Sequence, residues 1–130
     1  MKNTSLKNIK TTKRQVYLYW LKFLRPYHHL APREMEALST LLYYRQELSN
    51  QIDNEELVEK LLFSQEIRRK VKADLGGMDN GVFNNLLTAL RTKKVLTKEN
   101  KIIRPLIPRM EKDANAFNLI FNFEFADEEK

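Results

Sequence analysis

The pair Gly76-Gly77 divides the middle of the chain into two segments that each carry a helical spacing of apolar residues. Glycine accepts the left-handed backbone that ends many helices, so the pair marks a helix C-terminus. Before it, the apolar residues that recur at every fourth position are Ile67, Val71 and Leu75. After it, the residues at the spacing of one buried helix face are Phe83, Leu86, Leu87 and Leu90. Asp79 can cap the second helix, so the sequence predicts helices over 65–75 and 79–94 joined by a tight turn.

The residues that follow predict a short β-hairpin. The segments Val95-Leu96-Thr97 and Lys101-Ile102-Ile103 can pair as strands around Lys98-Glu99-Asn100. Pro105 cannot donate a ladder hydrogen bond and ends the run. This part of the chain is therefore expected to combine two helices with a small two-stranded hairpin.

Further helices are expected before this unit. Residues 32–48 open with Pro32, which suits the first turn of a helix, and residues 54–63 form a short acidic helix. Residues 13–25 are dense in apolar and aromatic side chains, and their period fits either a helix or a strand. Their length favours a helix ended by Pro26, because helical backbone is disfavoured in the residue before a proline.

Both ends of the chain carry candidate contact surfaces. A helix over 13–25 would be apolar nearly all round and would need cover from the domain or from a second chain. Residues 105–116 contain two prolines and are expected to be a linker. Residues 117–125, FNLIFNFEF, alternate with the period of a half-buried strand, which must pair with the hairpin, the N-terminal segment or another subunit. The side chains expected to make oligomer or partner contacts are Trp20, Phe23, Phe121 and Phe123.

The net charge of +6 is distributed in blocks. Residues 1–25 hold seven Lys or Arg and no acid, and residues 64–104 hold ten basic and four acidic residues. Residues 33–63 hold seven acidic and three basic residues, and residues 110–130 hold six acidic and two basic residues. Clustered basic charge is typical of nucleic-acid-binding proteins, although charge also serves solubility. The lysine-rich residues 1–12 are expected to be a flexible basic arm that follows phosphates, or an ordinary disordered terminus.

Several chemistries have no support in the sequence. The absence of cysteine excludes disulfides, thiolate zinc sites and cysteine nucleophiles. The three glycines give no phosphate-binding loop and no dinucleotide fingerprint. The adjacent pair His28-His29 has no acidic residue within four positions, which favours a packing or loop role over a metal site. We expect no enzymatic activity, no cofactor and no metal. No apolar run reaches the roughly 18–20 residues of a membrane span, and no signal-peptide stretch opens the chain, so we expect a cytoplasmic protein.

The pattern LG-x₄-G-x-FNNLLTALRTKKVL, which starts at Leu75, combines a leucine-glycine turn, an apolar-spaced helix with a basic end and a hydrophobic strand. At these residues the sequence resembles the winged helix-turn-helix family. The segments APREMEALSTLL and LLFSQEIRRKVKADLGG and the aromatic tail are also similar, more weakly, to small helix-turn-helix proteins of crAss-like tailed phages. The resemblance implies a mainly α fold with a small β-hairpin (α+β). Residues 13–104 would form a winged helix-turn-helix with an N-terminal helix, and residues 105–130 a linker, a C-terminal β-strand and an acidic tail.

The same resemblance implies that the helix over 79–94 enters the major groove of DNA. Asparagine suits adenine and arginine suits guanine, so base contacts are expected from Asn84, Asn85, Thr88 and Arg91. Phosphate contacts are expected from Arg68, Arg69, Lys72, Lys93 and Lys94, and hairpin-tip contacts with the DNA backbone or minor groove from Lys98 and Lys101. Alternatively, these residues solvate a helix of a small all-α domain, where basic residues late in the helix complement its dipole.

Three functions fit these features. The first is a sequence-specific, dimeric transcriptional regulator that binds double-stranded DNA. The second is a phage packaging or virion protein that uses the fold for contacts with phage or host proteins, or assembles with itself through residues 14–25 or 117–125. The third is a replication or recombination accessory that binds DNA by shape and charge. Fold alone does not separate them; the first and third predict salt-dependent DNA affinity, and only the first predicts a strong sequence preference.

Overall fold

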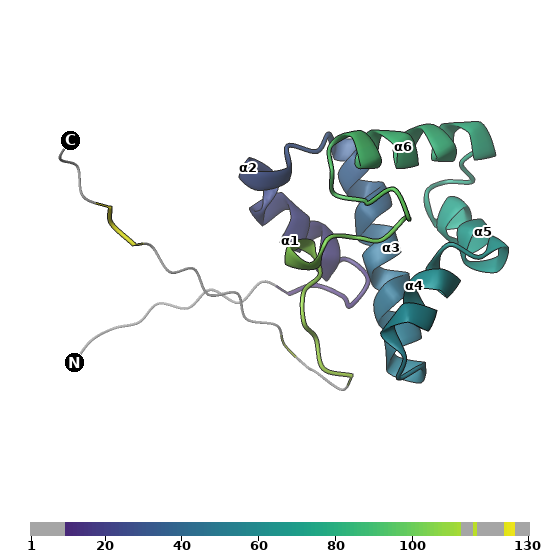
Figure 1. Ribbon diagram of the computed structural model, residues 1–130, viewed down its shortest axis with the longest axis horizontal. Helices are drawn as coiled ribbons and strands as arrows, with labels where there is room; N and C mark the ends of the chain where they lie inside the picture. The colour runs from purple at the N-terminus through teal and green to yellow at the C-terminus, as the bar shows by residue number, and fades with distance from the viewer. Residues whose placement is uncertain (1–9, 113–115, 117–123, 127–130) are drawn as a thin grey trace.

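The computed structural model describes residues 10–112, 116 and 124–126. Within these residues the chain forms six α-helices and one 3₁₀-helix, η1, and its β-structure is a single bridge (Figure 1). The elements are α1 Val16–Phe23, α2 Arg25–His28, α3 Pro32–Gln51, α4 Glu55–Leu62, α5 Gln65–Asp74, α6 Asn80–Thr92 and η1 Arg104–Leu106. The expectation of a mainly α fold is confirmed. None of the helices in the described part of the chain is long and apolar enough to cross a membrane.

Helix α3 is the centre of the fold. It packs against α1, α4, α5 and α6, and Figure 1 shows α1 and α5 on opposite sides of it. Its side chains Leu38, Leu41 and Leu42 are all but inaccessible to solvent. Buried residues lie on more than one face of α3, because helices cover it from several directions. The other core side chains come from α1, α4, α5 and α6, from Leu30 between α2 and α3, and from the segment after α6.

The residues with an ambiguous period are helical. Helix α1 ends at Phe23, and Pro26 lies in the first turn of α2, where its missing N–H leaves no intrahelical bond unmade. Pro26 therefore starts a short helix, and the break falls at Leu24 before it. His29 ends α2 in a left-handed conformation with φ of 54°.

His28 is a buried packing residue with both ring nitrogens in use. Its Nε2 lies 2.7 Å from the carbonyl oxygen of Leu21, and its Nδ1 accepts a hydrogen bond of 3.0 Å from the backbone N–H of Leu30. These partners require a neutral imidazole with the proton on Nε2. Burial is the main cause that lowers the pKa of His28, and the positive charges of Arg25 and Lys93 add to it.

We expect protonation of His28 to destabilise the fold. Because the pKa of His28 is lower in the folded chain than in the unfolded chain, its contribution to stability is complete above about pH 6.5 and is lost as the pH falls. Urea denaturation between about pH 7.5 and about pH 5.5 should show this loss in the wild type and a smaller loss in His28→Gln. The control His29→Asn, which tolerates left-handed backbone, should retain the wild-type pH dependence; an equal dependence in H28Q would contradict the assignment.

The predicted glycine end of α5 and the predicted Asp79 cap of α6 are confirmed, and α6 ends at Thr92, two residues before its predicted end. Ser64 accepts a hydrogen bond from the N–H of Ile67, and Asp79 accepts one from Gly81 at 2.9 Å. Gly76 and Gly77 both have positive φ, at 87° and 75°. After them the N–H of Met78 bonds the carbonyl of Lys72 at 2.9 Å, which closes α5 and turns the chain into α6.

The predicted β-hairpin is wrong. The described residues contain only one antiparallel bridge, between Leu96 and Ile102, and the chain then enters η1. The N–H group of Val95 is donated to the carbonyl of Leu90 at the end of α6, at 3.1 Å, and is not available to extend the strand ladder. Pro105 removes another donor. The helix cap and the proline together leave room for a tight loop but not for two strands.

The segment after the bridge packs on the domain. Leu106 is buried, although the sequence places it in a linker, and its carbonyl oxygen accepts a hydrogen bond of 2.9 Å from the indole N–H of Trp20. The predicted strand 117–125 lies outside the described residues except for its last two positions, which are not in a strand. Phe121 and Phe123 therefore remain predictions.

Candidate nucleic-acid interface

Helix α6 runs along one edge of the domain (Figure 1). Its inner face is anchored by Phe83, Leu87 and Leu90, which are buried in the core. The opposite positions, related by the helical period, are exposed and uncharged; they are Gly81, Asn85, Thr88 and Thr92. The whole of α6 holds no acidic residue and one basic residue, Arg91. The helix therefore presents a polar, nearly neutral ridge to solvent.

Helix α5 places a row of cations beside this ridge. The guanidinium of Arg68 donates a hydrogen bond of 2.6 Å to Oδ1 of Asn84 and lies 5.3 Å from the ring centre of Phe83. One turn later, Nζ of Lys72 lies 3.1 Å from Oδ1 of Asn80. Arg69 is exposed on the adjacent position and makes no ion pair within the described residues. Of the predicted phosphate contacts, Arg68 and Lys72 lie along α6, and Arg69 is exposed on the position after Arg68.

Arg91 has a structural partner that the sequence did not reveal. Its Nη1 donates to Oδ1 of Asn100 at 2.5 Å, and its Nη2 lies 3.4 Å from Oγ1 of Thr88. Asn100 adopts a left-handed conformation with φ of 64° at the turn after Lys98. Arg91 thus ties the last turn of α6 to the loop that replaces the predicted hairpin.

Two of the predicted DNA contacts are ion-paired inside the domain. Nζ of Lys93 lies 2.7 Å from Oε1 of Glu34, at the start of α3, and Nζ of Lys101 lies 3.9 Å from Oε1 of Glu59. Both would have to leave these carboxylates to reach a phosphate. Lys94 and Lys98 are exposed and form no ion pair with any residue the structure describes.

Asp74, the acid at the end of α5, is neutralised on the far side from α6. Its Oδ2 accepts hydrogen bonds from Arg14 at 2.5 Å and from Tyr44 at 2.6 Å. Burial by itself would raise the pKa of Asp74, but the hydrogen bonds from Tyr44 and Arg14 lower it below its usual value. The guanidinium of Arg14 also lies 4.3 Å from the ring centre of Tyr43. These contacts fix the start of the N-terminal segment against α3 and α5.

Sequence reasoning did not name two residues of the α6 surface, Asn80 and Val82. Asn80 forms the contact with Lys72, and the side chain of Val82 is exposed near the start of α6. Thr92, which the helical period places on one face with Asn85 and Thr88, is exposed at the other end. Nothing in the sequence marks Asn80 as a partner of Lys72, because the contact joins two helices.

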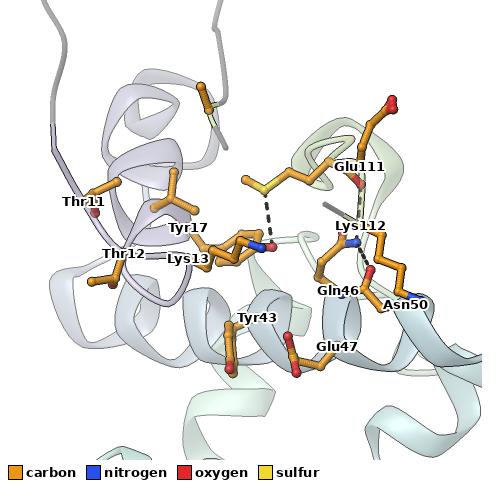
Figure 2. Close-up of a pocket in the computed structure, with 13 residues that line it drawn as sticks. Thr11, Thr12, Lys13, Tyr17, Tyr43, Gln46, Glu47, Asn50, Glu111 and Lys112 are labelled. Carbon is orange, nitrogen blue, oxygen red and sulfur yellow. Dashed lines mark hydrogen bonds between the residues drawn. The ribbon is translucent and has the colours of Figure 1, made fainter. Parts of the chain in front are cut away.

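A hollow of about 250 Å³ lies elsewhere, between the N-terminal segment, α1, α3 and the residues that follow η1 (Figure 2). Two hydrogen bonds cross the hollow: the Tyr17 hydroxyl donates to Sδ of Met110 at 3.5 Å, and Nε2 of Gln46 donates to the carbonyl oxygen of Met110 at 3.4 Å. Burial, with the nearby Glu47 and Tyr43, raises the pKa of Tyr17 to about 12. The Tyr17 hydroxyl therefore stays protonated near neutral pH and acts as a donor, not as a base.

No group of three or more His, Asp or Glu side chains in the described part of the chain is arranged to hold a metal ion. The chain matches no protein-family model, no curated protein and no solved structure.

Proposed function

We propose that this chain is a non-enzymatic protein that binds double-stranded DNA, as a small transcriptional regulator of the helix-turn-helix type. The observation that carries the proposal is the combination on one surface of a neutral, amide- and hydroxyl-bearing helix and a row of cations beside it. Amides and hydroxyls suit base edges, and cations suit phosphates. A surface meant only for solubility does not require this separation of the two kinds of side chain.

The dimensions of α6 support insertion into the major groove. A helix with side chains is about 10–12 Å across, and the major groove is about 12 Å wide. In this arrangement Asn84, Asn85 and Thr88 would face base edges, while Arg69 and Lys72 would meet phosphates on one strand. Lys94 and Lys98, beyond the other end of α6, would approach the backbone without the support of a wing hairpin.

The decisive test is binding of the full chain to random-sequence duplex DNA, measured by fluorescence anisotropy at about 50 mM and about 200 mM salt. We expect micromolar affinity at the lower salt and a steep decrease at the higher salt, because phosphate binding releases counterions. Absence of binding at both salt concentrations would overturn the proposal.

A second candidate function is a packaging or virion protein of a phage, which uses the fold for protein contacts. It is favoured by the exposed aromatic side chains of α1 and α2, where Tyr27 is 79% and Tyr19 is 41% exposed. Exposed aromatic residues are typical of protein interfaces. Sedimentation of the full chain would test it: a stable ring or higher oligomer that dissociates in Tyr19→Ser/Tyr27→Ser would support this function, and a monomer that binds DNA would not.

A further inference from the structure

Three cations on or beside α6 are bonded to side chains of the domain itself. Arg91, the one basic residue of α6, is held by Asn100 and Thr88. Arg68 and Lys72 donate hydrogen bonds to the side-chain amide oxygens of Asn84 and Asn80 on α6. Recognition of guanine in the major groove uses Arg or Lys against O6 and N7. The outward ridge of α6 therefore presents no cation placed to read guanine.

Thr88 presents a methyl group on that ridge. Its hydroxyl donates a hydrogen bond of 3.0 Å to the carbonyl of Asn84, one turn earlier, and lies 3.4 Å from the guanidinium of Arg91. The hydroxyl is thus used within the domain, which leaves the methyl as the group available for an external contact. Threonine methyl groups make apolar contacts with the C5-methyl of thymine.

Two residues near Thr88 on α6 also carry groups that suit an A·T base pair. Asn85 is exposed and its amide has no hydrogen-bond partner within the described residues, so both its donor and its acceptor are available to adenine N7 and N6. Val82 is 42% exposed and lies three residues before Asn85 on the same side of the helix. Its apolar side chain also suits a thymine methyl.

We propose that the α6 ridge selects A·T base pairs in the major groove, with Asn85 bonded to adenine and Thr88 in contact with a thymine methyl. This inference rests on the proposed function and makes it specific. Charge alone gives no preference between base pairs. Here the preference arises because the Thr88 hydroxyl and the Arg91 guanidinium are bonded within the domain, while the Thr88 methyl and the Asn85 amide are exposed.

The test compares duplexes of equal length in anisotropy titrations of the full chain at one low salt concentration. We expect A·T-rich duplexes to bind at least about tenfold more tightly than G·C-rich duplexes, since one well-formed bidentate base contact contributes about that much discrimination. Replacing thymine by uracil, which removes only the major-groove methyl, should weaken binding about fourfold for each methyl group that α6 buries. Replacing guanine by inosine should leave the preference unchanged, because inosine differs from guanine in the minor groove.

The variant Thr88→Ser assigns the methyl contact. Serine keeps the hydroxyl but lacks the methyl group, so T88S should show a smaller ratio of the affinity for the thymine duplex to the affinity for the uracil duplex. It should bind the uracil duplex as tightly as the wild type does. Thr40→Ser is the matched control, because Thr40 also bonds a carbonyl one turn earlier, at 2.9 Å, but lies on α3. T40S should keep the wild-type ratio of the two affinities.

The outcomes separate the two proposals. Binding without A·T preference, or a preference that inosine abolishes and uracil does not affect, would overturn the A·T inference and leave DNA binding intact. No binding to any duplex would overturn the proposed function itself.

Discussion

Replacement of Phe83 by alanine is expected to lower the free energy of unfolding by about 3–5 kcal/mol. The Phe83 side chain is 0% exposed and is the largest of the fully buried side chains in the core. It fixes α6 to the domain, and the guanidinium of Arg68 lies over its ring. Truncation removes apolar contacts and leaves a cavity that a helical core fills only in part.

The measurement is urea denaturation followed by circular dichroism. The control is the adjacent Val82→Ala, which shortens a side chain that is 42% exposed and should change stability by less than about 0.5 kcal/mol. If F83A is already unfolded without denaturant, Phe83→Leu takes its place. Leucine fills most of the volume of the phenylalanine side chain and should lower the free energy of unfolding by about 1 kcal/mol. A decrease below about 1 kcal/mol in F83A would show that α6 is not anchored to the core as described.

The double variant Arg69→Gln/Lys72→Gln is expected to weaken DNA binding by about 10- to 100-fold at low salt. Each phosphate contact changes the slope of log affinity against log salt by about one, so removal of both cations should reduce that slope by about two. Lys72 lies on the α6 side of α5, as its bond to Asn80 indicates, and Arg69 is an exposed neighbour three residues before it on the helix.

The chain offers a control with the same change in net charge. Lys70 lies two residues from Arg68 and from Lys72, about 200° around the helix, and so points away from α6. Lys60, on α4, is also exposed. Lys60→Gln/Lys70→Gln should retain the wild-type slope. Equal decreases in both double variants would show that net charge, and not the α5–α6 surface, drives binding.

The helices were largely predictable from local patterns. The spacing of Phe83, Leu87 and Leu90 identified the buried face of α6, and Asp79 and the two glycines marked its start and the end of α5. Local patterns suffice here because apolar periodicity and capping involve residues within a few positions of one another. The ambiguous residues 13–25 became helical because α1 packs on α3.

The candidate site was predictable only in part. The sequence named Arg68 and Lys72 as phosphate contacts, and the structure places both against α6, bonded to Asn84 and Asn80. The internal roles of Arg91 and Lys93 were not expected. Their partners, Asn100 and Glu34, lie in other elements, and the Lys93–Glu34 pair joins residues 59 positions apart. A sequence pattern shows that a side chain is charged but not which distant group neutralises it.

Short-range patterns in this chain specify where its helices begin and end, which face of each is buried, and that basic charge gathers around α5 and α6. The packing of the helices is needed to specify which cations stay available to a polyanion. This depends on hydrogen bonds and ion pairs between residues that the sequence does not place together, such as Lys93 and Glu34. The energies of these contacts arise only when the packed helices bring the groups within a few ångströms of each other.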